Sequence, residues 1–538
     1  MTTVHAAVAE VLAGHGQALF GVLGDANMQY VADFINGGGS YIGAIDERGA
    51  VMMAIGYARR LHRVGVVTVT HGPGLTNTLT SLVEAVRSRT PLVLLTGDTP
   101  PVPDYVQLLD VGAAVAPTGA HYRRVVAAET VADELSAALR RAQADRLPVV
   151  LDIPFHLLSR EVILPRRPGP IPERQAVRPD PDALDEALGI IASASRPVVL
   201  AGRGAALCDA REPLLALAHA LGAPVATTLL GRDLFRGDPC DLGVLGTVSH
   251  DIAIETVGAS DCVIAFGAGL NQYTTAHGWL ADGRAVVHVD DDQGRLDRYT
   301  PVTAGIVGDA AVVARAMTEQ LEAAGHSPSG FRSPALADRL AARDPRADFT
   351  DASTTEFLDA RTAMIELDEI LPADRVIVSD VGRYVIAPWK YLHVPEPLSF
   401  THTAAFGSIG LGIAAGVGAS AADRTRPTVV IAGDGGAMMG LIEFTTAVRE
   451  KLPLVVIVVN DRCYGAEWAQ MEKYGIDPAL SLIPWPSFET MASAFGGHGL
   501  TVRTAGDLKR IPDLIAEGKL PLMVDLHIDP AVVIGDIR

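Results

Sequence analysis

IAGDGG, residues 431–436, places Asp434 between glycines directly after the apolar, β-branched run PTVVIA of residues 427–432. A second carboxylate, Asp461 in VVNDRCYG (458–465), follows the next such run 27 residues later. That interval is long enough for one helical crossover between parallel strands. Because ligands of parallel sheets bind beyond the carboxyl ends of the strands, we expect the two carboxylates to converge on one ligand.

The whole chain repeats this rhythm of apolar strand runs separated by helical patterns. Such alternation is typical of parallel α/β sheets covered on both faces. Two stretches break it, a proline- and arginine-rich connector at 164–182 and a polar connector at 325–355. Since 538 residues are too many for one core, we predict three doubly wound parallel-sheet α/β domains. Their predicted bounds are 1–165, 183–324 and 356–538.

The composition limits the classes of binding partner and the cellular location that we expect. The chain has 44 Lys and Arg against 63 Asp and Glu, a formal charge of −19. We therefore expect a small-molecule ligand, and neither nucleic acid nor an anionic membrane surface. The four cysteines lie far apart without a CxxC pair, so they suggest neither a disulfide framework nor a zinc site. The first residues lack the pattern of a signal peptide, so we expect a cytoplasmic protein.

One uncharged stretch, TAAFGSIGLGIAAGVGASAA (403–422), has the length that spans a bilayer and contains Gly412-x-x-x-Gly416. Its many glycines, its few large side chains and the lack of a second such segment favour a helix buried in a protein core.

Carboxylates beside glycines at strand ends suit a hard divalent cation and an anionic ligand. Mg²⁺ takes oxygen ligands and commonly bridges carboxylates to phosphates, and the backbone amides of Gly433, Gly435 and Gly436 would be free to hold phosphate oxygens. A lone G-D-G occurs in many strand-end turns. The pair Asp434 and Asp461 makes the prediction specific.

This pair resembles the cofactor-binding motif of the thiamine-diphosphate-dependent 2-oxo acid decarboxylases and carboligases. The resemblance implies Mg²⁺ held by Asp434, Asp461 and the backbone carbonyl of Cys463 beneath the cofactor diphosphate. Asp461 stands where the family usually has a second asparagine. It adds negative charge and keeps an oxygen ligand.

The resemblance continues near the N-terminus and covers essentially the whole chain, as pyrimidine-binding, central and diphosphate-binding domains. DERGAVMMAIGYAR (46–59) is similar to the family segment that begins with the catalytic glutamate. This implies that Glu47 hydrogen-bonds the aminopyrimidine ring of the cofactor and promotes loss of the C2 proton. The other interpretation is a pair of helix-start carboxylates, Asp46 and Glu47, that complement the helix dipole. Asp46 replaces the family's usual histidine.

Two glycine-rich segments complete the implied cofactor site. THGPGLTN (70–77) resembles the family turn near the pyrimidine ring, shaped by Gly72 and Pro73, with Asn77 as a structural residue. FGSIGLGIAAG (406–416) resembles the segment that keeps the cofactor bent. By this resemblance Ile409 wedges between its two rings, and Gly407 and Ile409 bond the pyrimidine.

The substrate-facing residues give a mixed picture. Asp25 in GDAN and Glu467 match carboxylates of pyruvate-decarboxylase-like enzymes, and the other interpretations are a helix cap and a surface acid. The adjacent His-His pair of that subgroup is missing. The stretch at 97–117 resembles acetolactate-synthase-like carboligases instead, with Gln107 facing the cofactor, Asp110 retained and leucine replacing a glutamate at 108. An arginine that grips flavin in that subgroup is missing too, so we expect no FAD.

The resemblance implies a thiamine-diphosphate- and Mg²⁺-dependent enzyme that decarboxylates a 2-oxo acid and couples the product to a carbonyl acceptor. It also implies a homodimer or homotetramer with sites at the subunit interface. Three alternatives stay open: a simple decarboxylase that releases an aldehyde, a catalytically silent cofactor-binding homologue, and a nucleotide-binding oxidoreductase. AGRGAA (201–206) is only a partial dinucleotide fingerprint.

Overall fold

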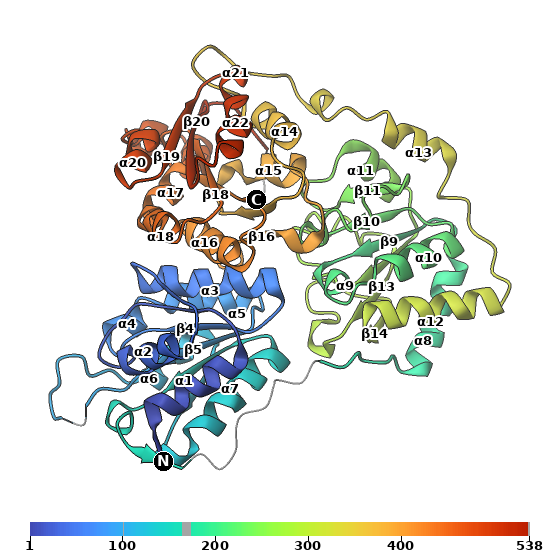
Figure 1. Ribbon diagram of the computed structural model, residues 1–538. Coiled ribbons are helices and arrows are strands. Elements are labelled where there is room, and N and C mark those ends of the chain that lie inside the picture. The colour runs from blue at the N-terminus through green and yellow to red at the C-terminus, as the bar shows by residue number, and fades with distance from the viewer. Residues whose placement is uncertain (101, 164–173, 536–538) are drawn as a thin grey trace.

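The computed structural model describes residues 1–100, 102–163 and 174–535. The chain folds into three α/β domains, each built on a six-stranded sheet in which all neighbouring strands run parallel (Figure 1). The predicted fold class is confirmed. Most strand residues are buried, because helices cover both faces of each sheet, and the exposed ones lie on edge strands such as β6 (His121–Arg124).

The first domain holds the sheet β3-β2-β4-β5-β7-β6. Thr2–Thr3 and Glu161–Val162 pair as a small antiparallel ribbon, β1 with β8, beside it. In sheet order the strands are β3 (Tyr41–Gly43), β2 (Leu19–Gly21), β4 (Gly65–Thr68), β5 (Leu92–Thr96), β7 (Pro148–Asp152) and β6 (His121–Arg124). The helices are α1 (Val4–His15), α2 (Met28–Asn36), α3 (Glu47–Leu61), α4 (Pro73–Thr76), α5 (Leu79–Arg87), α6 (Val111–Val115) and α7 (Val131–Asp145).

The central domain has the strand order β11-β10-β9-β12-β13-β14, which is the order of dinucleotide-binding sheets. In that order the strands are β11 (Asp241–Val244), β10 (Val225–Thr227), β9 (Pro197–Ala201), β12 (Cys262–Phe266), β13 (Ala285–Asp290) and β14 (Ala304–Val307). The helices are α8 (Pro181–Ser193), α9 (Arg203–Leu207), α10 (Arg211–Leu221), α11 (Asp251–Gly258) and α12 (Ala310–Ala323). Helix α8 begins inside the first predicted connector, and α13 (Pro334–Ala341) is a helix within the second.

The third domain holds the sheet β16-β15-β17-β18-β20-β19. Its strands in that order are β16 (Phe400–His402), β15 (Val376–Ser379), β17 (Thr428–Gly433), β18 (Leu454–Asn460), β20 (Leu522–His527) and β19 (His498–Val502). Its helices are α14 (Ala360–Ile370), α15 (Ile386–Tyr391), α16 (Gly412–Ala422), α17 (Asp434–Gly440), α18 (Phe444–Arg449), α19 (Gly465–Tyr474), α20 (Phe488–Ala494), α21 (Ala505–Leu508) and α22 (Arg510–Ala516). Counted along the chain, the first and third sheets share one strand order, in which the second strand is at one edge and the fifth at the other.

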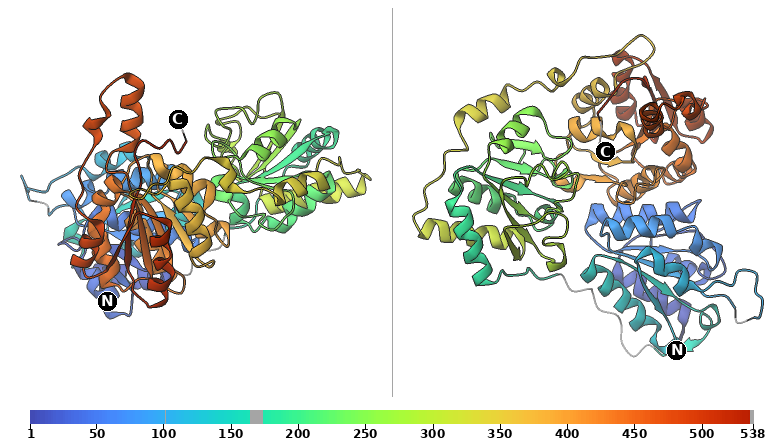
Figure 2. Two further views of the ribbon diagram at one scale, coloured as in Figure 1. Left: turned by 90° about the horizontal axis from the view of Figure 1, so that it is seen from above. Right: turned by 180° about the vertical axis from the view of Figure 1, so that it is seen from behind.

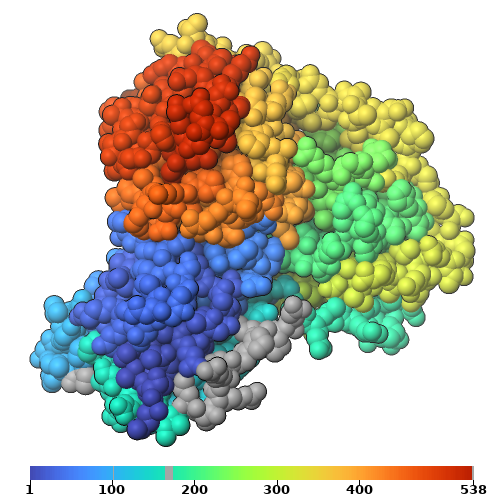
Figure 3. Space-filling model, viewed as in Figure 1, coloured from blue at the N-terminus to red at the C-terminus, as the bar shows by residue number. Residues whose placement is uncertain are grey.

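The first and third domains pack directly on each other through α3 and α16 (Figures 1 and 2). The helix backbones touch, since a Cβ added at Gly56 would lie 2.0 Å from the carbonyl oxygen of Ala415, and one added at Gly418 would lie 1.8 Å from that of Met53. One hydrophobic cluster runs through both domains across this contact. Figure 3 shows the third domain resting on the first, with the central domain beside them.

Helix α16 accounts for the uncharged stretch considered as a membrane span. Its residues from Gly412 to Ser420 are buried in the shared core. Within the described part of the chain, no helix is long and apolar enough to cross a membrane.

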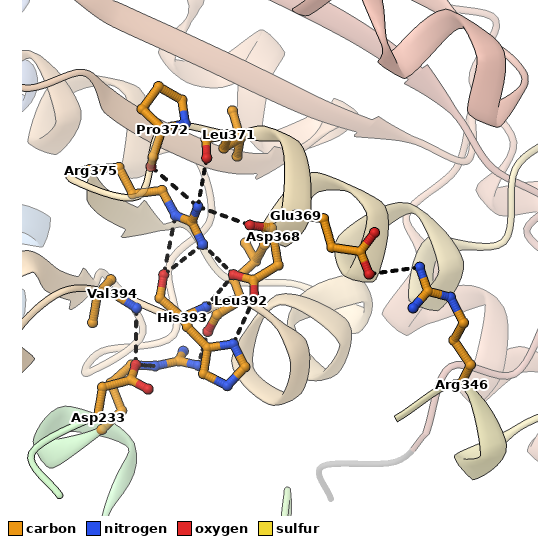
Figure 4. A network of polar contacts seen from close by, with 11 residues as sticks. Asp233, Arg346, Asp368, Glu369, Leu371, Pro372, Arg375, Leu392, His393 and Val394 are labelled. Atoms are coloured by element: carbon orange, nitrogen blue, oxygen red, sulfur yellow. Dashed lines mark hydrogen bonds and ion pairs between the residues drawn. The ribbon is translucent and has the colours of Figure 1, made fainter. Parts of the chain in front are cut away.

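A polar network joins the central domain to the third (Figure 4). Asp233 accepts a hydrogen bond from the Val394 amide at 3.0 Å, and the buried Arg232 donates to the carbonyl of Leu392. Arg375 holds the same loop by donating to the carbonyl of His393 at 2.9 and 3.1 Å. These bonds fix the segment that leads into β16.

Candidate active site

The paired carboxylates lie past adjacent strand ends, as the sequence predicted. Strands β17 and β18 run parallel with Gly433 opposite Val459, so Asp434 and Asp461 emerge at the same edge of the sheet. Asp434 is 3% exposed. One of its oxygens accepts the Gly435 amide at 2.7 Å, while the buried Oδ2 has no partner at hydrogen-bond geometry among the described residues, although the nearby Trp485 side chain and Arg462 amide act to lower the pKa of Asp434.

Electrostatics at this pair fit a cation site. Burial and the neighbouring charge of Asp461 raise the pKa of Asp434, and burial raises the pKa of Asp461. A divalent cation between them would offset the repulsion between the two carboxylates and give the unpaired Oδ2 of Asp434 a partner. The described residues contain no cluster of three or more His, Cys, Asp or Glu side chains arranged to hold a metal. A cation at this pair would therefore need further oxygen ligands, which the Cys463 carbonyl, water and phosphate oxygens could supply.

The glycines beside this carboxylate pair pack closely against neighbouring side chains, so that a larger residue there would displace a neighbour. A Cβ at Gly435 would lie 2.6 Å from the ring of Tyr464, and one at Gly436 would lie 2.8 Å from Oδ2 of Asp380. Gly433 is the last residue of β17 and precedes Asp434 at the start of α17. The glycine-rich turn thus folds tightly against its neighbours.

Asp380 is a site residue that the sequence analysis missed. It is 1% exposed and follows β15. It accepts hydrogen bonds from the Gly410 amide at 2.9 Å, the Thr403 hydroxyl at 3.0 Å and the Val381 amide at 2.9 Å. Asp380 thereby organises the turn that carries Gly407 and Ile409. An acid directly after the run RVIVS was the available signal, and it repeats the pattern of Asp434.

Gly407 and Ile409, in the segment predicted to bend the cofactor, lie between β16 and α16. Gly407 has a φ of +84° and Gly410 one of +85°, in the left-handed region that favours glycine. The roles implied for Gly407 and Ile409 remain predictions.

Glu47 is the first residue of α3, and the two carboxylates at this helix start differ in position, while the catalytic role of Glu47 stays a prediction. Asp46 is the N-cap and accepts the Gly49 amide at 3.2 Å. Glu47 is half-buried, and its Oε2 accepts a hydrogen bond from the Asn77 amide group at 2.9 Å. A Cβ at Gly74 would lie 3.6 Å from the other oxygen. The carboxylate therefore faces the glycine-proline turn.

Gln107 lies beside the same turn. Gly72 has a φ of +61°, and a Cβ there would lie 2.7 Å from the Gln107 carbonyl oxygen. The side-chain oxygen of Gln107 lies 2.8 Å from Nε2 of His71, which is 1% exposed. The structure thus brings Glu47, Gly72, Pro73 and Gln107 together at one edge of the first sheet.

Asp25 and Glu467 are exposed. Asp25 lies in the turn before α2, which Asn27 holds by accepting the Gly24 amide at 2.8 Å. Glu467 lies in the first turn of α19. Their assignment to proton transfer stays a prediction.

Comparison with known proteins decides the family. Three domain families match the chain: "Thiamine pyrophosphate enzyme, N-terminal TPP binding domain" at residues 2–106, the corresponding central domain at 184–317, and the C-terminal TPP binding domain at 380–526. The chain belongs to the thiamine pyrophosphate enzymes. The two families named for cofactor binding coincide with the two sheets that carry the predicted site residues.

Relatives of this enzyme span nearly its whole length. Sulfoacetaldehyde acetyltransferase of Alcaligenes xylosoxydans xylosoxydans is 28% identical, with 96% of this chain and 92% of the relative covered. The large subunit of acetolactate synthase isozyme 2 of Escherichia coli K12 is 27% identical, with 95% and 92% covered.

A solved structure shares the fold. The thiamine diphosphate-dependent 4-hydroxybenzoylformate decarboxylase of Rhodococcus jostii RHA1 has a TM-score of 0.82 and 22% sequence identity. The match covers 98% of this chain and 99% of that one. At this identity it informs the fold alone.

Proposed function

We propose that this thiamine pyrophosphate enzyme requires Mg²⁺, decarboxylates a 2-oxo acid and couples the remaining acyl unit to a second carbonyl compound. The observation that carries the proposal is the buried Asp434 beside the half-buried Asp461, because this pair presents a carboxylate oxygen without a hydrogen-bond partner at a glycine-rich strand end. When bound, thiamine diphosphate supplies the carbon nucleophile that attacks the substrate carbonyl and allows CO₂ to leave.

The residues of the chain divide the remaining work. Asp434, Asp461 and the Cys463 carbonyl would hold the metal, and the amides of Gly433 and Gly436 would bind the diphosphate, since the predicted contribution of the Gly435 amide is ruled out by its hydrogen bond to Asp434. Glu47 holds a proton at its carboxylate, with Asn77 fixing one of its oxygens. Gln107, oriented by His71, positions the substrate, and Asp25 and Glu467 handle later protons.

We further propose that the working unit is a homodimer or a homotetramer. Glu47 and Asp434 belong to different domains, and large apolar side chains are exposed on loops after the strand ends of both sheets. Val106 is 93% exposed and Leu108 63% in the first domain, while Leu480 is 73% exposed in the third. A second copy that covers these loops would place the first-domain edge of one chain against the third-domain edge of the other.

Flavin is not part of the proposed enzyme. At the switch point of the central sheet, Arg203 donates to the Ser88 carbonyl of the first domain at 2.8 Å. Asp292 and Asp291 pair with Arg89 at 2.6 Å and Arg146 at 2.5 Å. Of these contacts between domains, that of Arg203 engages a group at the switch point itself, and a flavin absorbance spectrum of the purified protein would contradict this assignment.

The test is incubation of the purified protein with thiamine diphosphate, Mg²⁺ and a panel of 2-oxo acids, with and without aldehyde or second 2-oxo acid acceptors. CO₂ release that is accompanied by a 2-hydroxyketone product supports carboligation. CO₂ with free aldehyde in every reaction would favour a simple decarboxylase. Bound cofactor without CO₂ from any 2-oxo acid would identify a catalytically silent homologue.

A further inference from the structure

Two buried glutamates hold backbone loops across the interface between the first and third domains. Glu443 ends the short helix η9 (Leu441–Glu443) of the third domain and is 2% exposed. Its Oε1 accepts the amides of Ile45 at 3.1 Å and Asp46 at 3.0 Å, both in the first domain. The Thr446 hydroxyl holds its other oxygen at 2.7 Å.

Glu84 makes the reverse contact from α5 of the first domain. It is 0% exposed. One oxygen accepts the Ala405 amide at 3.3 Å and the other accepts the Phe406 amide at 2.7 Å, both in the third domain. Arg59 of α3 lies 3.9 Å from Glu84 and donates to the carbonyl of His402 at 2.6 Å.

The two contacts are related by the shared strand order. Each glutamate follows the third strand of its own sheet, β4 or β17. Each accepts two successive amides in the loop after the second strand, β3 or β16, of the other sheet. Those loops lead directly into predicted site residues, because Asp46 precedes Glu47 and Phe406 precedes Gly407.

The bonds are suited to fixing position. A carboxylate accepting backbone amides makes charge-assisted hydrogen bonds, about twice as strong as neutral ones. Burial raises the pKa of each glutamate, while Arg59 and the bonded amides act to lower that of Glu84. Neither carboxylate touches the carboxylate pair of the candidate site, so any effect on chemistry passes through the loops that they hold.

We propose that Glu84 and Glu443 are positioning residues of this enzyme, each holding the loop that presents site residues of the other domain. The inference rests on the proposed function for its catalytic consequence. The pair, which we call the reciprocal clasp, ties the placement of Glu47 to the third domain and the placement of Gly407 and Ile409 to the first.

The two arms of the reciprocal clasp respond differently to amide replacement. Glu84 uses one oxygen for each backbone amide, so Glu84→Gln can keep only one bond and turns an NH₂ group toward the other donor. Glu443 uses a single oxygen for both amides, so Glu443→Gln can keep both, with its NH₂ group facing the Thr446 hydroxyl. We therefore expect Glu84→Gln to have the larger effect, and Glu443→Ala to open its own arm.

The experiment measures hydrogen exchange of the cofactor-free protein, thiamine diphosphate binding with Mg²⁺ by tryptophan fluorescence, and kcat. Glu84→Gln should raise exchange at 405–406 and weaken cofactor binding, each by at least about tenfold, with little change at 45–46. Glu443→Ala should raise exchange at 45–46 and lower kcat by about tenfold or more, and Glu443→Gln should change either by only a few-fold. Glu450→Gln is the control, because that carboxylate pairs with Arg424 and Arg449 and should leave all three readouts unchanged.

Unchanged exchange at 405–406 in Glu84→Gln, or increased exchange without loss of cofactor affinity, would overturn the proposal. If Glu84→Gln does not fold, Glu84→Asp shortens the same arm and is judged by the same readouts. Wild-type protein that binds cofactor but releases no CO₂ would refute the proposed function alone, since exchange and binding still judge the reciprocal clasp.

Discussion

The first and third sheets share a strand order but end in opposite chemistry. After its third and fourth strands the third sheet presents the buried carboxylate of Asp434 and the half-buried one of Asp461, whose mutual repulsion suits a cation. The first sheet presents the glycine-proline turn, the Gln107 side chain and the carboxylate of Glu47 at the equivalent edge. We propose that one framework supports a metal- and phosphate-binding half and a proton-handling half, and that the loops carry the difference.

The largest effect should come from the proton-handling half. Glu47→Gln keeps the size and the Asn77 contact but removes the exchangeable proton, and we expect turnover to fall about 10³-fold. Cofactor binding and the melting temperature should be nearly unchanged. CO₂ release measures the turnover, and calorimetric titration with thiamine diphosphate measures the cofactor affinity. Full activity in the variant would show that Glu47 has no part in the mechanism.

The metal-binding half should tolerate one change and not another. Asp434→Ala deletes the orphaned oxygen, and Mg²⁺-dependent cofactor binding should weaken by at least about 100-fold. Asp461→Asn keeps an oxygen at the position where the family usually has asparagine, and it should retain binding within about tenfold. Equilibrium binding at several Mg²⁺ concentrations compares the two variants. Equal losses would show that the two carboxylates are not distinct in role.

The packing of α3 against α16 joins the first and third domains, and it can be disturbed without changing a predicted site residue. Gly418→Ala places a methyl group against the Met53 carbonyl, and overpacking of this kind costs about 1–3 kcal/mol. The matched control is Gly189→Ala in α8, where nothing lies within 4 Å of the added Cβ. That change should be neutral or slightly stabilising. Urea unfolding measures both, and a Gly418→Ala protein as stable as the control would refute backbone contact between α3 and α16.

The smallest expected effect is a pH dependence of the free energy of unfolding that arises from Asp152 of the first sheet. Burial raises the pKa of Asp152, at the end of β7, from its usual 3.8 to about 6, although Tyr122 and Arg124 oppose the shift. Since the folded-state pKa lies above the unfolded one, its contribution to stability is full below pH 4 and is lost as pH rises through about 6. Asp152→Asn should therefore gain about 1–3 kcal/mol relative to the parent between pH 4 and pH 7.

Unfolding free energies of parent and Asp152→Asn across that range test the prediction, with the exposed Asp185→Asn as the control. Parallel curves for the parent and Asp152→Asn would contradict it.

The sequence predicted the parts of this architecture that follow from local pattern. Asp434 and Asp461 follow buried runs, and the parallel-sheet rule alone brings them to one edge. Glu84 shows what local pattern cannot supply. Within its helix it resembles a solvated acid, and its burial depends on two amides 321 and 322 residues away in the sequence. Contacts between domains of this kind leave no periodic trace in the chain.

Asp380 lies between these cases, since its position after a strand run was visible. Its partners Thr403 and Gly410 became identifiable only when the turn before α16 was seen to fold back over it. The role of Asp46 likewise became identifiable only in the structure. It stands where the family usually has histidine, and it serves as the N-cap of α3.

The central sheet stands beside the other two, which meet through α3 and α16 without it. Remodelling of the central domain would therefore leave the α3–α16 contact in place, provided that it kept the bonds of Arg203 to the Ser88 carbonyl and of Arg232 to the Leu392 carbonyl.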